Sequence, residues 1–453
     1  KKRMSATAQQ LEERLEELEK QLALRDQRLA SLLATYNWVK KKKPAENPGS
    51  SHDEEQRKIL KPTVSSVRAT ELLNDLYGIS ILRPLKELDS YDDVNFLVVA
   101  QGTEGGGEQR FTLKIHNGVE SKDYGILEAQ NKMMLHIRAS SIPCPAPVPN
   151  CTGDLISFAS LDTLGGGSCR LAVRLLTWVH GATMSDIGSD EETLELSGLF
   201  LGKITSALRG FDHRSAHRDH AWDVAKTSSI RGFTKHITEP KRRCLVESVL
   251  DAFEREAKPA ASSLDKAIIM GDFNDANVIL ATGSDVLPCD KVVGIIDFGD
   301  MVYTWRVNEI AIAMAYAMLS SWGKAGNHCA AAGAVLRGFA RTCHVQEGEI
   351  RMLRVLVACR LACSYTYGMY SFSKDPSNKY LLLHASPAGR ALEVWWQEAS
   401  EDALLDLIRS AVSNHYPLKW EINLTEQKKT VPSGDQSGHE MEEGSSNDVL
   451  VTS

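Results

Sequence analysis

The chain has 453 residues, of which 43% are hydrophobic and 25% are charged, and its formal net charge is −7. This composition is ordinary for a soluble globular protein and allows two or three domains or lobes with a substantial core. The acidic balance argues against a nucleic-acid-binding protein, and the longest apolar stretch, residues 310–319, is too short to cross a bilayer.

The nine cysteines are scattered and show neither a CxxC pair nor the spacing of a zinc site. The first residues lead into a charged segment and not into the apolar core of a signal peptide. We therefore expect free thiols in a reducing compartment and a cytoplasmic protein that contacts no membrane.

Residues 1–43 carry the spacing of a helix with a heptad seam. Its leucines alternate mostly four and three residues apart, with Arg25 interrupting the series, at Leu11, Leu15, Leu18, Leu22, Leu29 and Leu32. This pattern is typical of a coiled coil, which would give a homodimer, but it also fits a single solvated helix or a partly folded arm. Residues 44–62 are polar, contain Asn-Pro-Gly-Ser and predict a linker.

The segment 63–176 predicts a small antiparallel sheet with helices packed against it. Strands are expected over residues 95–100, 110–116, 155–159 and 170–176, and helices over residues 70–77 and 127–137. The glycine runs at 102–107 and 165–167 lie between strands, so we interpret them as hairpin tips and not as phosphate-binding loops.

The segment 177–424 predicts a largely helical lobe, and the polar tail 425–453 is expected to be disordered. Helices are expected over residues 191–208, 241–256, 308–322, 330–342, 349–367 and 391–411. A sheet lobe followed by a helical lobe gives an α+β fold with two lobes.

Two acidic motifs in the helical lobe point to chemistry. Asp272 begins an Asp-x4-Asn pattern that ends at Asn277, and Asp297 begins a later Asp-Phe-Gly pattern. Apolar runs at 266–270 and 292–296 precede the motifs, so we expect two loops at the ends of neighbouring strands. An acid, an amide and a second acid in this order are the acidic core of kinase-type phosphoryl transfer.

In that chemistry, Asp272 would accept the proton of an attacking hydroxyl group. Asn277 and Asp297 would hold the Mg²⁺ ions that bridge the phosphates of a nucleotide. The simpler alternative is that the two motifs are unrelated acidic turns, because Asp-Phe-Gly also forms ordinary turns.

Two features near the motifs qualify this interpretation. Met270 stands where a kinase usually has a histidine that braces the loop by hydrogen bonding, so the reaction would be slowed or the site degenerate. The tripeptide His217-Arg218-Asp219 looks like a kinase catalytic sequence, but Val224 follows where an asparagine is required. We interpret this tripeptide as part of a polar surface loop.

Lys114 lies inside a predicted strand with apolar neighbours, where a lysine is costly unless it is paired. Glu128, near the start of the next predicted helix, is its expected partner. A strand lysine paired with a helix glutamate is the kinase arrangement that orients nucleotide phosphates. The alternative is an exposed lysine on an edge strand.

Three further residues are expected to contact the nucleotide. Asn95 belongs to the segment 90–96, which takes the place of a glycine-rich loop but has no glycine, and it would shape a turn over the phosphates. Leu176 and Thr177 end the last strand of the sheet lobe. There the backbone would pair with the nucleotide base.

Together these features resemble the aminoglycoside phosphotransferase-type kinases, a small-molecule branch of the protein-kinase-like fold, and within them the hydroxylysine kinases. The stretches that carry the resemblance are residues 90–96, 113–115, 173–177, 271–277, 294–301 and 359–363, with Glu309. The resemblance covers residues 63–411. It implies transfer of the γ-phosphate of GTP, with Mg²⁺, to the 5-hydroxyl of 5-hydroxy-L-lysine in the cytoplasm.

Such a substrate has two ammonium groups and one carboxylate, and the site should complement them. Asp275, Asp300 and Glu309 are the nearby acids that would face the ammonium groups. Arg360 would bind the carboxylate in a bidentate pair. For each residue a surface acid or a helix salt bridge is an open alternative.

Three other functions remain open. The protein could be a kinase for another small hydroxylated amine or a sugar. It could be a catalytically degenerate kinase-like module that only binds its ligands, as Met270 and the missing glycine loop suggest. It could also be a scaffold that acts through its heptads.

Overall fold

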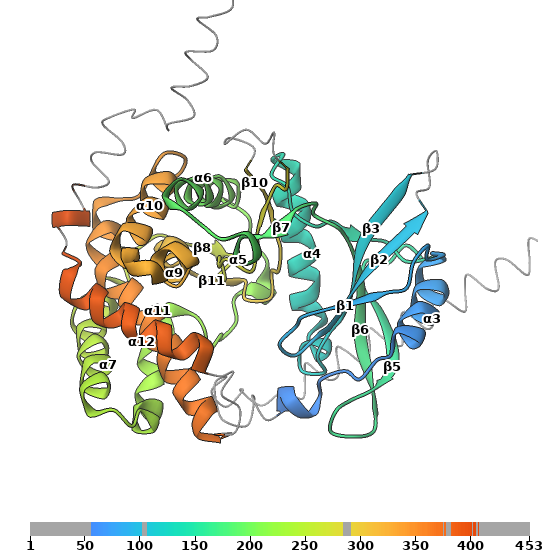
Figure 1. Cartoon of the computed structure of the whole chain (residues 1–453), viewed down its shortest axis with the longest axis horizontal. Helices are drawn as coiled ribbons and strands as arrows, with labels where there is room; N and C mark the ends of the chain where they lie inside the picture. The colour runs from blue at the N-terminus through green and yellow to red at the C-terminus, as the bar shows by residue number, and fades with distance from the viewer. Residues whose placement is uncertain are drawn as a thin grey trace, which may run out of the picture. The chain divides into compact units, whose positions relative to one another are not determined.

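The computed structural model describes residues 56–101, 107–283, 291–374, 376, 382–400, 402–404 and 406. In this part of the chain a β-sheet lobe precedes a mainly helical lobe (Figure 1). The predicted heptads at 1–43 and the predicted tail at 425–453 lie outside the described residues. The homodimer expected from the heptads therefore stays a prediction.

The first lobe is built on one antiparallel sheet. Its strands are β1 (Lys86–Leu88), β2 (Val94–Gln101), β3 (Glu108–Ile115), β4 (Pro147–Val148), β5 (Ser157–Asp162) and β6 (Ser168–Thr177). The order across the sheet is β1-β2-β3-β6-β4, and β5 also pairs with β6. Gly166 and Gly167 have positive φ angles at the turn between β5 and β6, which confirms the hairpin tip predicted there.

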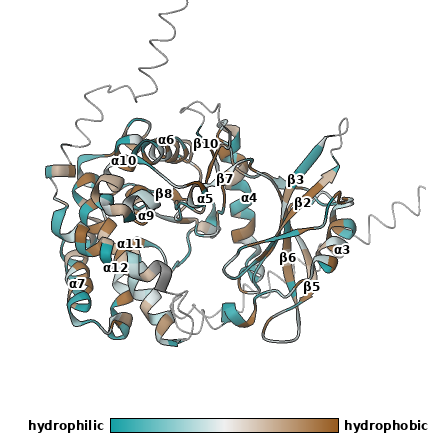
Figure 2. Ribbon diagram, viewed as in Figure 1, coloured by the Kyte–Doolittle hydropathy of each residue, from teal (hydrophilic) through white to brown (hydrophobic). Residues whose placement is uncertain are grey.

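Alternating apolar residues explain how this sheet packs. The buried positions of β2 are every second residue, at Val94, Phe96, Val98 and Ala100. The first three residues of β3 are exposed and hydrophilic, so this end of the strand extends beyond the core (Figure 2). Two helices, α3 (Ser66–Tyr77) and α4 (Tyr124–Ala139), accompany the sheet.

The second lobe is mainly helical. Its α-helices are α5 (Met184–Ile187), α6 (Glu191–Ala207), α7 (Pro240–Ala252), α8 (Lys258–Ala260), α9 (Val307–Ala317), α10 (His328–Ala340), α11 (Glu347–Lys374) and α12 (Leu382–Glu398). Its short strands are β7 (Ala182–Thr183), β8 (Lys266–Ile269), β9 (Val278–Leu280), β10 (Val292–Ile295) and β11 (Val302–Trp305). Helical turns of other types in this lobe are η2 (Arg214–Ala216), η3 (Val224–His236), η4 (Phe253–Ala257) and η6 (Gly323–Asn327), whereas η1 (Glu120–Lys122) lies in the sheet lobe between β3 and α4.

The helix α9 forms the centre of this lobe. Every residue of α9 is buried except Tyr316, which is half-buried. A helix that is apolar on all sides must be covered on all sides, and α10 and α11 both pack against it. None of the helices in the described part of the chain is both long and apolar enough to cross a membrane.

The predicted α+β fold with a sheet lobe and a helical lobe is confirmed, but one expectation about its topology is wrong. The two motif loops do not leave neighbouring strands, because β8 pairs with β11 and β10 pairs with β9. The reason is that the apolar residues directly after Asn277 form β9, which takes the place beside β10.

Candidate active site

The loops after β8 and β10 touch each other at Gly271 and Asp300. Gly271 has a φ of +81°, and a Cβ atom at this position would lie 2.6 Å from the carbonyl oxygen of Asp300. Only glycine combines this backbone conformation with so close an approach. The two motifs predicted from the sequence therefore meet, and Asp272 lies directly beside their contact.

Three side chains hold the Asp272 carboxylate. Oδ2 accepts hydrogen bonds from the amide nitrogens of Asn274 at 2.9 Å and Asn277 at 3.0 Å, and Oδ1 accepts one from Arg360 at 3.3 Å. Burial, and then repulsion from the Asp300 carboxylate, raise the pKa of Asp272 to about 7 although Arg360 opposes them. A carboxylate with a pKa near neutrality is able to take up a proton during a reaction.

The antiparallel pairing of β9 with β10 brings Asn277 and Asp297 together. The amide of Ile296 donates to the carbonyl oxygen of Asn277 at 2.9 Å, so the residues that flank these two strands are neighbours. Asp297 has a φ of +60°, which is unusual outside glycine and marks a constrained position. Its side chain is 47% exposed, so a ligand can reach the carboxylate.

Lys114 reaches from the sheet to the Asp297 loop. Its Nζ lies 2.8 Å from Asp93 Oδ2 and 3.7 Å from Asp297 Oδ2. Burial alone would lower the pKa of Lys114, but Asp297 and Asp93 raise it above its ordinary value, so the ammonium stays charged. The alternative of an exposed edge-strand lysine is wrong, because β3 is an inner strand and the side chain is 14% exposed.

The predicted pair of Lys114 with Glu128 is also wrong. The Glu128 carboxylate lies 2.9 Å from Lys132, one turn along α4, and its side chain is 40% exposed. The inner face of the helix carries Gln130 instead, whose Oε1 accepts a hydrogen bond from Arg174 of β6. Residues two positions apart point to opposite sides of a helix, so Glu128 is directed away from the sheet.

The other residues predicted to contact the nucleotide lie inside the sheet. Asn95 pairs with Lys114 across β2 and β3, so it lies in a strand and not in a turn, and its Oδ1 is buried with no hydrogen-bond partner among the described residues. The Thr177 amide donates to the carbonyl oxygen of Ala146, and the Thr177 hydroxyl accepts from the Ala146 amide. These groups of Thr177 are therefore unavailable to a base, and Leu176 is 8% exposed.

Glu309, one of the predicted substrate contacts, serves the loop backbone instead. The residue is fully buried, and its carboxylate accepts the amide hydrogens of Met270 at 2.6 Å and Gly271 at 3.3 Å. Burial raises the pKa of Glu309 to about 7. The prediction of a substrate contact is wrong because both carboxylate oxygens already bind the backbone.

Arg360 is likewise committed inside the protein. Its Nη1 donates to the carbonyl oxygen of Trp222 at 3.0 Å, and its Nη2 donates to the Tyr316 hydroxyl at 2.7 Å and to Asp272. The residue is 2% exposed. The predicted bidentate pair with a substrate carboxylate is therefore wrong, and Arg360 holds Asp272 instead.

Asp275 and Asp300 border the site. Asp300 Oδ1 lies 3.2 Å from Nε2 of His220. Burial would raise the pKa of Asp300, but His220 and Arg360 lower it to about 2, so the group is charged at neutral pH. Asp275 lines a pocket together with Met184, Leu194, Ser197, Phe273, Asn274, Ala313, Tyr316, Ala317 and Val335.

The segment interpreted as a polar surface loop contributes two residues that the sequence reasoning missed. Besides His220 beside Asp300, Arg218 donates to the carbonyl oxygens of Gly299 and Met301, directly after Asp297. Asp219 pairs with Lys226 and is 62% exposed, so it is not the catalytic acid. No spacing rule connects Arg218 with a loop so distant along the chain.

Comparison with known proteins places these features in a family. Residues 87–343, which include Lys114 and both motif loops, match the phosphotransferase enzyme family. The chain is 29% identical to a hydroxylysine kinase of Xenopus laevis over 367 residues, which cover 78% of this chain and 96% of the relative. The resemblance predicted from the motifs is confirmed.

Solved structures agree on the fold. A microcompartment-associated aminopropanol kinase matches with a TM-score of 0.53 at 15% identity, over 74% of this chain and 98% of its own. An amicoumacin kinase, solved in complex with AMP-PNP and Ca²⁺, matches with a TM-score of 0.52 at 13% identity, over 78% of this chain and 97% of its own. The chain belongs to the phosphotransferase enzyme family.

Proposed function

We propose that the protein transfers the γ-phosphate of GTP to the 5-hydroxyl of 5-hydroxy-L-lysine. The similarity to a hydroxylysine kinase over almost the whole length of that relative supports this substrate. The observation that carries the proposal is the meeting of Lys114, Asp272 and Asp297 at one place. They come from a strand of the sheet lobe and from two separate loops of the helical lobe.

Asp272 is the proposed general base. Its raised pKa matches the task of accepting a hydroxyl proton near neutral pH. Asn277 and Arg360 fix the carboxylate from two sides, so its orientation is set before the substrate binds. Asp272 would take the proton while the substrate oxygen attacks the γ-phosphorus atom, whose bond to the β–γ bridging oxygen breaks and releases GDP.

Asn277 and Asp297 are the proposed Mg²⁺ ligands. The donor set fits this ion, which prefers carboxylate and amide oxygen atoms. The Asn277 amide nitrogen is directed at Asp272, so its amide oxygen is directed away from that residue. A bound Mg²⁺ would neutralise charge on the nucleotide phosphates.

Lys114 is the proposed phosphate contact. Its ammonium has three hydrogens, and Asp93 holds it at 2.8 Å, while Asp297 is at the longer distance of 3.7 Å. A phosphate oxygen can therefore bind Lys114 without displacing Asp93. Asn95 lies on the same face of the sheet, and its buried, unpartnered Oδ1 is an acceptor for a hydroxyl or amino group of the nucleotide.

Asp275 and Asp300 are the proposed partners of the substrate ammonium groups. A small cavity beside Asp275 is lined mainly by apolar residues and borders the loop that carries Asp272. Asp300 is charged and lies against the same loop. Acidic groups in these two places complement a substrate with two positive charges.

The experiment is a substrate and nucleotide panel on the full chain. We expect GTP-dependent phosphorylation of 5-hydroxy-L-lysine and no phosphorylation of L-lysine, which lacks the acceptor hydroxyl. Asp272→Ala should reduce kcat by about 10²–10⁴-fold without unfolding the protein. Asp219→Ala is the matched control, because this exposed acid belongs to the sequence that only looks catalytic.

Two outcomes would replace the proposal. Phosphorylation of another small hydroxylated amine or a sugar, but not of hydroxylysine, would retain the kinase and change its substrate. Nucleotide binding without turnover on any hydroxylated amine would identify a degenerate binding module. The Glu309 bonds to the loop argue against that second outcome, because they brace the loop through its backbone at the position where the usual histidine is missing.

A further inference from the structure

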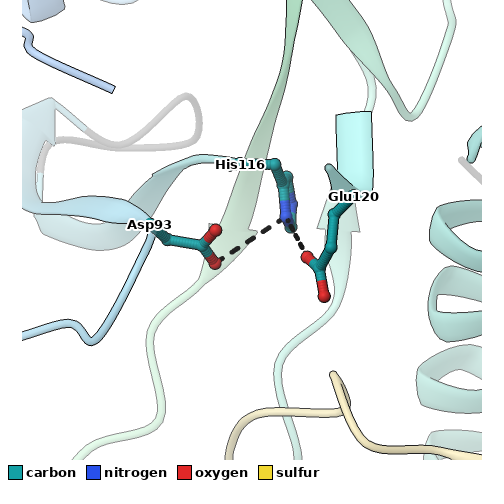
Figure 3. Close-up of side chains that lie close together, drawn as sticks. All are labelled: Asp93, His116 and Glu120. Carbon is teal, nitrogen blue, oxygen red and sulfur yellow. Dashed lines mark hydrogen bonds and ion pairs between the residues drawn. The ribbon is translucent and has the colours of Figure 1, made fainter. Parts of the chain in front are cut away.

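Asp93, His116 and Glu120 form a buried cluster (Figure 3). The cluster adjoins Lys114, whose Nζ lies 2.8 Å from Asp93 Oδ2. Asp93 precedes β2, His116 follows β3 and Glu120 lies in η1. His116 is fully buried, and the side chains of Asp93 and Glu120 are 7% and 15% exposed. Two acids and one histidine so close together have the composition of a metal site. Whether the cluster can bind a metal ion depends on which nitrogen of His116 carries the ring hydrogen.

Arg174 fixes the tautomer of His116. The Nε of Arg174 lies 2.9 Å from Nε2 of His116, and an arginine can only donate. Nε2 must therefore be the acceptor, and the ring hydrogen is on Nδ1. This Nδ1 lies 3.0 Å from Glu120 Oε2 and 3.8 Å from Asp93 Oδ2, so it donates to Glu120.

This arrangement leaves no ligand atom on His116 for a metal ion. Nδ1 carries the hydrogen and Nε2 faces the guanidinium of Arg174, so both nitrogens are in use. Burial, and then the charge of Arg174, lower the pKa of His116, which agrees with a neutral ring. Lys114 and Arg174 supply two positive charges, which balance the carboxylates of Asp93 and Glu120 without a bound cation.

The cluster connects the sheet to the loop that carries Asp297. A Cβ atom at Gly299 would lie 3.9 Å from Glu120 Oε1, so the second oxygen of Glu120 faces that loop. Asp93 Oδ1 accepts the Asn117 amide at 2.8 Å, which fixes the carboxylate that holds Lys114. The hydrogen bonds from Arg174 to His116 and from His116 to Glu120 thus lead to the Asp297 loop. Asp93, in the same cluster, contacts the lysine itself.

We propose that Glu120, aligned by His116 and Arg174, acts with Asp93 as the positioning pair for Lys114, in place of the helix glutamate predicted from the sequence. The inference rests on the proposed function, because Lys114 is taken as the phosphate contact. Asp93 contacts the lysine directly, and Glu120 adds negative charge near the lysine while its Oε1 faces the Asp297 loop. The cluster holds no metal ion.

The test compares two glutamates. Glu120→Ala should raise the KM and the Kd for the nucleotide by about tenfold, the size expected for one charge-assisted hydrogen bond, and should leave the KM for the amine unchanged. Glu120→Gln restores an acceptor for His116 without the charge and should recover part of the loss. Glu128→Ala is the matched control and should behave as the wild type, since Glu128 faces away from the sheet.

Equal nucleotide affinities in Glu120→Ala and Glu128→Ala would overturn the inference. Zn²⁺ titration of the protein without nucleotide is the second test. A Zn²⁺-binding site that is present in the wild type but lost in both His116→Asn and Glu120→Gln would also overturn the inference. Nucleotide binding is measured without the amine, so its result does not depend on which substrate the protein phosphorylates. A wild type that binds nucleotide but does not phosphorylate hydroxylysine would reject the proposed function alone.

Discussion

The carboxylate of Glu309 accepts the backbone amide hydrogen of Met270 at 2.6 Å. This bond explains how the loop tolerates methionine where a histidine is usual. The loop is held through its backbone from α9, and the Met270 side chain is free to pack in the core, where it is fully buried. The sequence alone suggested a weakened loop at this position.

Replacing Glu309 by glutamine should destabilise the protein. A glutamine has one acceptor oxygen, so one of the two amides of Met270 and Gly271 would face an NH₂ group and remain unpaired. We expect a loss of about 1–3 kcal/mol in the free energy of unfolding at pH 5, measured by urea denaturation. Glu71→Gln on the exposed face of α3 is the control, and an equal stability of the two variants would contradict the bracing role.

The destabilisation caused by Glu309→Gln should shrink as the pH rises. The pKa of Glu309 is raised to about 7 in the folded state from an ordinary value of 4.5, so the folded state binds more protons than the unfolded state between these values. The stability that this group contributes is therefore complete below pH 4.5 and is lost as the pH rises through 7. A gap between wild type and variant that widens from pH 5 to pH 7.5 would disprove this.

Restoring the usual histidine should not improve the enzyme. The position of Met270 is fully buried among apolar residues, and an imidazole there would lose its hydrogen bonds to water. We expect Met270→His to lower the free energy of unfolding by about 1–3 kcal/mol and to leave kcat no higher than in the wild type. Faster turnover at unchanged stability would mean that the missing histidine does limit the reaction.

Gly271→Ala should separate the two motif loops. Alanine would bring its Cβ to 2.6 Å from the carbonyl oxygen of Asp300, in addition to the strain of a φ of +81°. Gly153→Ala isolates the second effect, because Gly153 has a φ of +83° and no atom within 4 Å of the added Cβ. The control should lose about 1–2 kcal/mol of stability, whereas Gly271→Ala should lose more and should also lower kcat. Similar kinetics in both variants would argue against a tight contact.

Arg218→Ala should weaken the Asp297 loop. Arg218 donates to the carbonyl oxygens of Gly299 and Met301, so its removal leaves the backbone after Asp297 less fixed. The Mg²⁺ concentration for half-maximal activity should rise about tenfold, as expected for lost charge-assisted hydrogen bonds. Asp219→Ala changes the adjacent exposed residue and should have no effect. An unchanged Mg²⁺ dependence in Arg218→Ala would show that the loop holds its shape without the arginine.

The parts of the site that the sequence predicted are those set by local spacing. Asp272 and Asn277 lie in one short loop, and Asp297 is identified by its Asp-Phe-Gly motif. These residues could therefore be matched directly to kinase-type phosphoryl transfer. Lys114 was recognisable because a lysine in an apolar strand needs a partner. The sheet and the long helices followed from periodicity in the same way.

The parts that the sequence missed depend on which way a side chain points and on contacts between distant segments. The expectation for Glu128 failed because a difference of two residues reverses the facing side of a helix. Glu309 and Arg360 were assigned to the substrate because their charges are suitable, but burial turns both toward the protein itself. Arg218 reaches its neighbours only through tertiary packing, for which a single sequence carries no signal.

The pairing of β9 with β10 has a consequence for how the enzyme would release its product. Asn277 and Asp297 flank the paired strands β9 and β10, so they belong to one two-stranded ribbon, whereas Lys114 belongs to the other lobe. Any hinge rotation of the lobes would change the separation of Lys114 from Asp297 and leave the spacing of Asn277 and Asp297 unaltered. With the nucleotide held as proposed above, its site would open by withdrawal of the Lys114 ammonium group while Asn277 and Asp297 keep their mutual geometry.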